Sequence, residues 1–285
     1  MKTNNPASDL HEYLNIGVDA WGICLEKSFA FLREAWENQW VGLPCLLNRC
    51  IEVLNLSPAS ISSDASNIVL TAQSVAQAIE LECANNPEYV EPRYHNRLHT
   101  ADVMTAMAVL LRIQTDKHKS LDQEWVACAL LAAIGHDFGH PGQVNQLESE
   151  IESKTLQLLQ PFLSNHNVTS YWCNALSCAI LKSDFAIVEK NHALVQGQEF
   201  KCDQNWLNVF LNEADIMASA SAKFGPQMGH LLSKELELVN FPAYQSVATE
   251  KGRQAFLNKL VFSSHASNVL NVNSSIAKEL MVLNK

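Results

Sequence analysis

The stretch QEWVACALLAAIGHDFGHPG, residues 123–142, joins a strongly apolar run to a cluster of ionisable side chains. From Gln123 to Ile134 the run is apolar nearly all round, and a helix without a polar face usually lies in the centre of a domain. Asp122 fits the N-cap of this helix, and Gly139 with the Pro-Gly pair that follows ends it. We therefore expect a protein built around one central helix.

The remaining sequence predicts an all-α fold, a compact multi-helix bundle. Glycine and proline number only 10 and 9 among 285 residues, so few turns are available for short strands. Apolar residues at helical spacing between Trp21 and Trp40 predict a packing surface. Further helices are expected at about 67–84, 94–114, 147–163, 168–182, 204–221, 226–239, 249–262 and 266–283, with Pro161, Pro226 and Pro242 near the breaks.

We expect one continuous globular unit. Residues 1–66 would form an N-terminal helical segment, ending in a serine-rich linker at 58–66 and packed on a catalytic domain at 67–285.

The net charge of −10 argues against a nucleic-acid partner. Eight cysteines without a CxxC pair indicate reduced thiols and hence a cytoplasmic protein, with no signal peptide and no apolar run long enough for a membrane. Nothing in the sequence indicates an oligomeric state.

Two motifs place histidines and a carboxylate at metal-ligand spacing. In YHNRLHTADV, His95 and His99 are four residues apart and share one helix face. That pair alone fits two structural histidines better than a metal site. In HDFGHPG, His136 and Asp137 are adjacent beside a chain bend and can reach one metal ion. Three ionisable groups at the end of an apolar helix need a compensating partner, which weakens a purely structural interpretation.

A third motif, NEADIMAS, contains Asp215 among small and apolar residues. Without the other two motifs, an ordinary capping or hydrogen-bonded aspartate would be the better interpretation.

Together the motifs resemble the catalytic domain of the class I cyclic nucleotide phosphodiesterases, which is related to the wider HD-domain phosphohydrolases. That family shows YHNxxHAxDV, then HDxxHPGxxN, then a later AD. This chain reads YHNRLHTADV, HDFGHPGQVN and EADI in the same order. The match runs from about residue 94 to 148 and continues thinly to about 260. The resemblance implies metal-dependent hydrolysis of a 3′,5′-cyclic nucleotide, cAMP or cGMP or both, to the 5′-monophosphate.

The resemblance also implies roles for matching residues. His99, His136, Asp137 and Asp215 would hold a first metal, and two imidazoles with two carboxylates suit zinc, iron or manganese. Asp137 would bridge to a second ion, magnesium or manganese. A hydroxide between the ions would attack phosphorus, and His95 would protonate the leaving ribose oxygen.

Five further residues would orient metal-bound water or support the turn after HPG: His140, Asn145, Glu148, Ser183 and Asp184. Ser183 or Asp184 could equally cap a helix. The family has a longer loop before an LENHH stretch, whereas here LESEIE follows Asn145 almost at once. Glu150 or Glu152 could therefore replace Glu148, or all three could form a solvated face.

The substrate would contact Tyr94, Gln254 and Phe256. In the family a purine-binding glutamine precedes a phenylalanine by three residues, but here Arg253 takes that place and Gln254 lies one position later. One residue on a helix turns a side chain by about 100°. The substrate could be a cyclic purine nucleotide bound differently or another phosphodiester. Two alternatives stay open, namely an HD-type phosphohydrolase acting on another nucleotide or phosphoester, and a catalytically inactive nucleotide-binding helical domain.

Overall fold

The computed structural model describes residues 21–36, 38–57, 60–85, 89–119 and 121–285. Every regular element within these residues is a helix, which confirms the all-α prediction. The helices are α2 Trp21–Ala35, α3 Leu43–Val53, α4 Ser63–Asn85, α5 Arg97–His118, α6 Gln123–Gly135, α7 Glu150–Asn165, α8 Ser170–Leu181, α9 Val188–Val195, α10 Gln204–Ala220, α11 Gly225–Leu238, α12 Tyr244–Val247, α13 Glu250–Leu257, α14 His265–Val269 and α15 Val272–Leu283.

The helix α6 lies in the core, as its apolar sequence predicts. All residues from Trp125 to Gly135 are buried. The Asp122 side chain accepts a hydrogen bond from the backbone N–H of Trp125 at 2.8 Å, so the expected N-cap is present. This helix packs against α4, α5, α8 and α10, and α5 and α10 also contact each other. The end of α6 is therefore brought beside α5 and α10.

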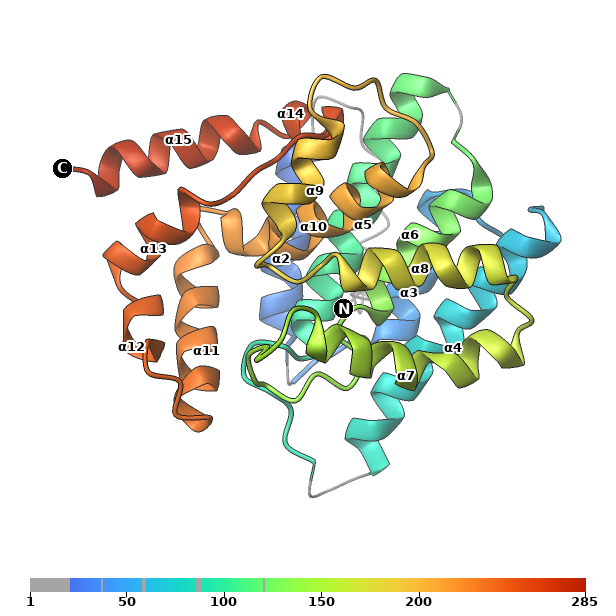
Figure 1. Cartoon of the computed structure of the whole chain (residues 1–285), viewed down its shortest axis with the longest axis horizontal. Coiled ribbons are helices and arrows are strands. Elements are labelled where there is room, and N and C mark those ends of the chain that lie inside the picture. The colour runs from blue at the N-terminus through green and yellow to red at the C-terminus, as the bar shows by residue number, and fades with distance from the viewer. Residues whose placement is uncertain (1–20, 37, 58–59, 86–88, 120) are drawn as a thin grey trace, which may run out of the picture.

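The remaining helices surround this centre (Figure 1). The helices α4 and α7 lie on one side of the molecule, and α11, α12 and α13 lie on the other. The C-terminal helix α15 projects at the edge, where it contacts α13 and α14. Asn96 caps α5 by accepting hydrogen bonds from the N–H groups of Leu98 and His99, which fixes the start of this helix beside the centre.

Several predicted boundaries differ from the structure. The helix α4 begins at Ser63 and passes through the expected end of the linker. Pro161 does not end a helix, because it lies inside α7 on an exposed side where water can bond the freed carbonyl. The expected helix at 266–283 is two helices, separated at Asn271 by a left-handed backbone with φ of 56°. The helices α9 and α12 were not predicted.

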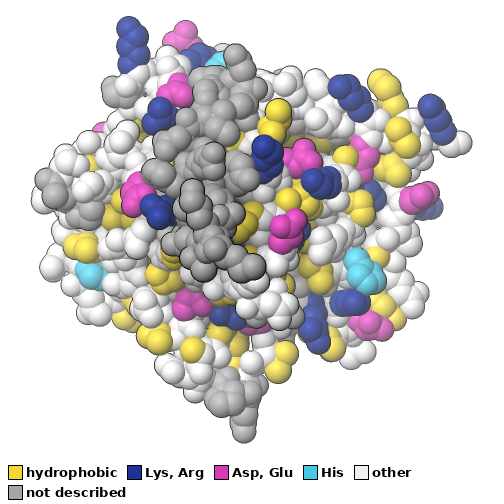
Figure 2. Space-filling model, turned by 180° about the vertical axis from the view of Figure 1, so that it is seen from behind, with side chains coloured by type: hydrophobic (Ala, Val, Ile, Leu, Met, Phe, Trp, Pro, Cys, Tyr) yellow, Lys and Arg dark blue, Asp and Glu magenta, His cyan; other side chains and the backbone are white. Residues whose placement is uncertain are grey.

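The described surface carries both signs of charge. On the face shown in Figure 2, acidic and basic side chains are interspersed among the described residues.

Among the helices of the described chain, none is both long enough and apolar enough to cross a bilayer. All eight cysteines are free thiols, and burial raises the pKa of Cys50 and of Cys128 to about 12.

Candidate metal centre and active site

Four side chains, from α5, from α10 and from the residues just after α6, converge at the end of α6. His99 lies in the first turn of α5, His136 and Asp137 follow α6, and Asp215 lies on α10. The Nε2 atom of His99 is 3.1 Å from Asp215 Oδ1 and 3.3 Å from Asp137 Oδ2. The Nε2 atom of His136 is 3.2 Å from Asp137 Oδ2 and 3.6 Å from Asp215 Oδ1. The structure therefore brings together the four residues expected to hold the first metal.

This donor set fits a divalent metal ion. The Nε2 atoms of His99 and His136 are buried and make no hydrogen bond of good geometry, although both face carboxylate oxygens. His136 Nδ1 lies 3.0 Å from the carbonyl oxygen of Ala133. Because a carbonyl can only accept, Nδ1 carries the proton and Nε2 is directed at the carboxylates. Two imidazoles and two carboxylates around one point form a common ligand set for such an ion.

The charges in the cluster explain its acid–base properties. Burial alone would lower the pKa of His99, but Asp137 and Asp215 outweigh burial and raise it to about 9. Burial would raise the pKa of Asp137, but His136 and His99 hold it well below its ordinary value. In the metal-free protein the imidazoles are therefore protonated partners of the carboxylates. A metal ion would take the place of these protons.

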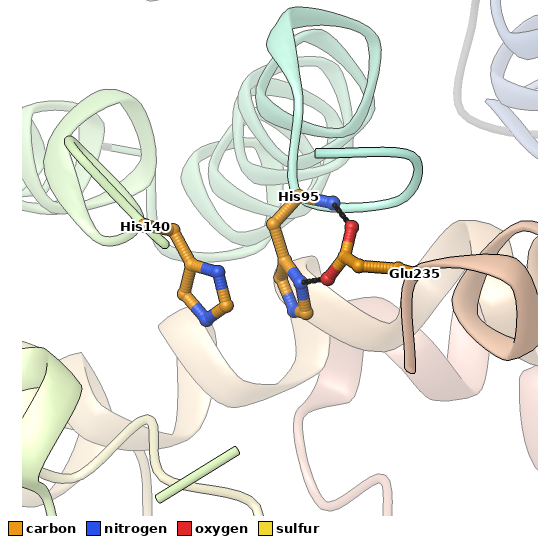
Figure 3. Close-up of side chains that lie close together, drawn as sticks. All are labelled: His95, His140 and Glu235. Carbon is orange, nitrogen blue, oxygen red and sulfur yellow. Dashed lines mark hydrogen bonds and ion pairs between the residues drawn. The ribbon is translucent and has the colours of Figure 1, made fainter. Parts of the chain in front are cut away.

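A second group surrounds His95, just before the start of α5 (Figure 3). Glu235 of α11 is 2% exposed, and its Oε1 atom pairs with His95 Nδ1. Its Oε2 atom accepts the backbone N–H of Tyr94 at 2.6 Å and that of His95 at 3.1 Å. Burial would raise the pKa of Glu235, but these hydrogen bonds and the His95 ring lower it. Glu235 is thus an ionised carboxylate that fixes both the position of His95 and the proton on Nδ1.

His140 lies on the other side of His95. The two rings stack with centroids 3.8 Å apart and planes 26° apart. His140 Nδ1 accepts the backbone N–H of Gly142 at 3.1 Å. Burial and the neighbouring His95 lower the pKa of His140 to about 4, so this ring is neutral at pH 7. His95 and His140, expected in different roles, therefore share one wall of the site.

A cavity of about 520 Å³ opens next to both groups. Its lining includes His95, Asp137, His140 and Asp215, together with Asn145, Glu148, Glu152 and Asp184. Asn145 Nδ2 donates to Glu152 Oε2 at 2.9 Å and to Asp184 Oδ2 at 3.1 Å. Burial, with added repulsion from Asp184 and Asp137, raises the pKa of Glu152. Glu152 therefore belongs to the same electrostatic cluster as Asp137.

The other expected residues of this region lie differently. Glu148 is exposed at the edge of the cavity and has no described hydrogen bond to Asn145 or Asp184. The hydroxyl of Ser183 donates to the carbonyl of Ile180 at 2.8 Å, and Ser183 caps the end of α8 in this way. Of the three glutamates in LESEIE, the structure places Glu152 beside Asn145.

A smaller cavity of about 300 Å³ contains two of the three expected substrate contacts. Tyr94 and Phe256 line it, whereas Gln254 does not. Gln254 Nε2 instead donates to the side chain of Asn284, near the end of α15. The hydroxyl of Tyr94 lies 2.9 Å from Ser219 Oγ, and burial raises the pKa of this phenol.

The motifs did not reveal Glu235. It lies in the stretch SKELEL, where it is one of two glutamates in a helix of ordinary composition. Only its burial and its contacts with His95 distinguish it from the exposed Glu237. Asp102, which lies inside the first motif, forms a buried ion pair with Arg33 of α2, with Oδ2 2.8 Å from Nη2. Nothing near Arg33 in the sequence indicates this partner.

Comparisons with known proteins agree with these observations. A family model for 3′5′-cyclic nucleotide phosphodiesterase matches residues 94–190. The human high affinity cAMP-specific and IBMX-insensitive 3′,5′-cyclic phosphodiesterase 8A is 33% identical over 144 residues, which cover 50% of this chain and 14% of the human protein. The cGMP-specific 3′,5′-cyclic phosphodiesterase delta of Plasmodium falciparum is 30% identical over 113 residues, covering 38% of this chain and 14% of that protein.

Two further matches extend the comparison. The 3′,5′-cyclic-nucleotide phosphodiesterase 2 of Saccharomyces cerevisiae is 35% identical over 102 residues, covering 33% of this chain and 19% of the yeast protein. The solved structure of LmjPDEB1 in complex with IBMX has a TM-score of 0.66 at 14% identity, covering 97% of this chain and 98% of that chain. This chain thus spans a small part of the curated relatives. The matches confirm the resemblance seen in the motifs and the fold that it implied.

Proposed function

We propose that this chain, which has the motifs and the fold of a class I cyclic nucleotide phosphodiesterase catalytic domain, hydrolyses a 3′,5′-cyclic nucleotide to the 5′-monophosphate. The observation that carries the proposal is the position of His95. Its ring, held by Glu235, lines the same cavity as Asp137 and Asp215. A positioned acid thus stands beside a set of metal ligands.

We assign the first metal ion to His99, His136, Asp137 and Asp215, and zinc, iron or manganese suits these donors. Asp137 would also contact a second ion, magnesium or manganese, whose water molecules would meet the oxygen atoms of Glu152 and Asp184. When bound, such ions provide a nucleophile from water at neutral pH and neutralise charge on the phosphoryl oxygens. The small-molecule substrate would enter through the 520 Å³ cavity.

The protein's own residues handle the proton of the leaving group. As the bond between phosphorus and the ribose 3′-oxygen breaks, that oxygen takes a proton from His95 Nε2. The carboxylate of Glu235, which faces Nδ1, stabilises the imidazolium before the transfer and holds the ring in position. The neutral ring of His140 stacks on His95 and adds no opposing charge.

Product release from cAMP and cGMP tests the proposal. The purified chain is incubated with manganese or magnesium, with and without a chelator, and the 5′-monophosphate is measured. We expect turnover that the chelator abolishes. His95→Ala should lose about 10²- to 10⁴-fold in turnover, the usual contribution of a general acid, while its metal content is unchanged.

His230→Ala is the matched control, because His230 is an exposed histidine on α11. It should behave like the wild type. Bound metal without turnover of either nucleotide would move the search to other phosphoesters. Absence of both turnover and bound metal would favour an inactive binding domain.

A further inference from the structure

The 300 Å³ cavity adjoins the metal centre. Phe185 lines both this cavity and the 520 Å³ cavity that contains Asp137 and Asp215. Tyr94, in the wall of the smaller cavity, directly precedes His95. A substrate whose phosphate lies at the metal centre can therefore extend its other end into the smaller cavity.

The walls of the smaller cavity are suited to a flat apolar group. The rings of Phe185 and Phe256 stack with centroids 5.9 Å apart and planes 27° apart. Met228, Leu232 and Val247 line the same space. Every nucleobase presents a flat π-face, and stacking on an aromatic side chain favours all bases to a similar degree.

Arg253 also lines this cavity, but its hydrogen-bond donors are already bound to the protein. Its Nε donates to Glu279 Oε1 at 2.8 Å, and its Nη2 donates to Glu279 Oε2 at 2.9 Å. The guanidinium also donates to the carbonyl groups of Ser219, Ala220 and Ser221 at the end of α10. Of the five N–H groups of an arginine, at most one is left for a ligand.

One side of the guanidinium is also closed by the protein. A Cβ atom added to Gly225 would lie 2.3 Å from Arg253 Nη1 and 2.4 Å from Cζ, so the guanidinium lies directly against the backbone of α11. Arg253 is 9% exposed, and the carboxylate of Glu279 neutralises its charge. Arg253 is therefore a fixed wall of the cavity.

The hydroxyl groups of this lining also bond to the protein. Those of Tyr94 and Ser219 share one hydrogen bond, in which one hydroxyl donates and the other accepts, and Ser246 Oγ donates to the carbonyl of Ala243 at 2.7 Å. Lys259 is exposed at the cavity and offers only donors. Among the side chains of this lining, none is a free amide or carboxylate that could accept from one base and donate to another.

We infer that this cavity binds the base of the nucleotide by stacking and shape, with no amide or carboxylate side chain that reads the edge of the purine. The inference rests on the proposed function and concerns its specificity. Sites that exclude a ligand through unpaired hydrogen-bonding groups discriminate by about 10⁴- to 10⁵-fold, whereas apolar pockets reach only about 10- to 200-fold. The chain therefore hydrolyses both cAMP and cGMP.

The ratio of kcat/KM for cAMP and cGMP tests this inference, measured at one metal concentration. We expect a ratio within about 200-fold in either direction. A larger ratio would overturn the inference and leave the proposed function standing. If neither nucleotide is hydrolysed, the proposed function fails and the inference fails with it.

Two variants test the stacking and the absence of an edge reader. Phe256→Ala should lower kcat/KM by the same factor for both nucleotides, roughly 5- to 150-fold, which is the effect of losing one stacked base. Phe256→Leu keeps the apolar volume and serves if the alanine variant does not fold. Tyr171→Ala removes an exposed aromatic side chain outside the cavity and should change neither rate.

A substitution at Gln254, the residue after Arg253, tests whether an amide outside the cavity affects the choice between the two bases. Gln254→Ala should leave the ratio for the two bases unchanged, because Gln254 bonds to Asn284 outside the cavity. An unchanged rate in both Phe256 variants, or a ratio altered more than tenfold by Gln254→Ala, would overturn the inference.

Discussion

Replacing Glu235 by glutamine isolates the contribution of one buried charge to the proposed proton transfer. The substitution keeps the shape of the side chain, and the amide oxygen can still accept the backbone N–H groups of Tyr94 and His95. It removes the negative charge that faces His95 Nδ1. The protonated ring then loses its stabilising partner, while the candidate metal ligands are unchanged.

The expected loss follows from the strength of this hydrogen bond. Hydrogen bonds to charged groups contribute about 1.5–3 kcal/mol, and Glu235 is only 2% exposed, so water screens it little. Each 1.36 kcal/mol corresponds to a factor of ten in rate. Turnover of cAMP by Glu235→Gln should therefore fall roughly 10- to 150-fold.

The assay compares two leaving groups. Release of 5′-AMP requires protonation of an alkoxide, whereas bis(4-nitrophenyl) phosphate releases a stable phenolate that needs no acid. Glu235→Gln should lose much less activity on the second substrate. Glu237→Gln, two residues along α11 and exposed, is the matched control. Equal losses on both substrates, or wild-type turnover of cAMP, would refute the reasoning.

Three further predictions test separate parts of the structure. Asp102→Asn should lower the free energy of unfolding, measured by urea titration, by about 3 kcal/mol, because it leaves the buried charge of Arg33 unpaired. A loss under about 1 kcal/mol would contradict this expectation. Burial lowers the pKa of His192 to about 4, below its value near 6.5 in the unfolded chain. Between these two pH values the unfolded chain therefore binds more protons than the folded protein, and the free energy of unfolding falls as the pH falls. We expect His192 to account for about 2 kcal/mol of the stability lost between pH 7 and 5. Urea titrations at both pH values compare the wild type with His192→Asn. The free energy of unfolding of the variant should fall less over this range than that of the wild type. Glu152→Gln should raise the magnesium concentration for half-maximal activity about 10- to 100-fold and Glu148→Gln should not, so the reverse order would return the role to Glu148.

The elements that were predictable from sequence depend on local signals. The helix α6 combines a continuous apolar run with a capping aspartate, and both its burial and its start follow from that run. The two unpredicted helices, α9 and α12, are only 8 and 4 residues long. Such short helices are stabilised by the tertiary contacts around them rather than by their own sequence. The helix break expected near Pro161 was wrong because the effect of a proline depends on tertiary structure, namely on whether its side of the helix is exposed to water.

The residues of the site were likewise predictable only where a local sequence pattern identifies them. The four candidate metal ligands lie in short motifs, and helix geometry together with the resemblance is enough to expect them at one point. Glu235 comes from α11, at a separation of 140 residues from His95, and no local pattern identifies it. The choice among the three glutamates after Asn145 depends on how the chain enters α7. Glu152 on this helix accepts a hydrogen bond from Asn145, whereas Glu148 precedes the helix at the exposed edge of the cavity. Spacing in the sequence cannot decide that orientation.

The candidate metal centre and the smaller cavity are joined through the end of α10. Asp215 and Ser219 lie one turn apart on this helix. The hydroxyl of Ser219 meets Tyr94, and its carbonyl accepts a hydrogen bond from Arg253.

The last carbonyl groups of a helix have no partners within it and need donors from elsewhere. A guanidinium with five N–H groups can satisfy three such carbonyls and a carboxylate at once, whereas a glutamine amide has only two. The same arginine that closes the smaller cavity therefore also ends the helix that carries a candidate metal ligand, and an amide that turned to match each base could not hold the end of α10 in this way.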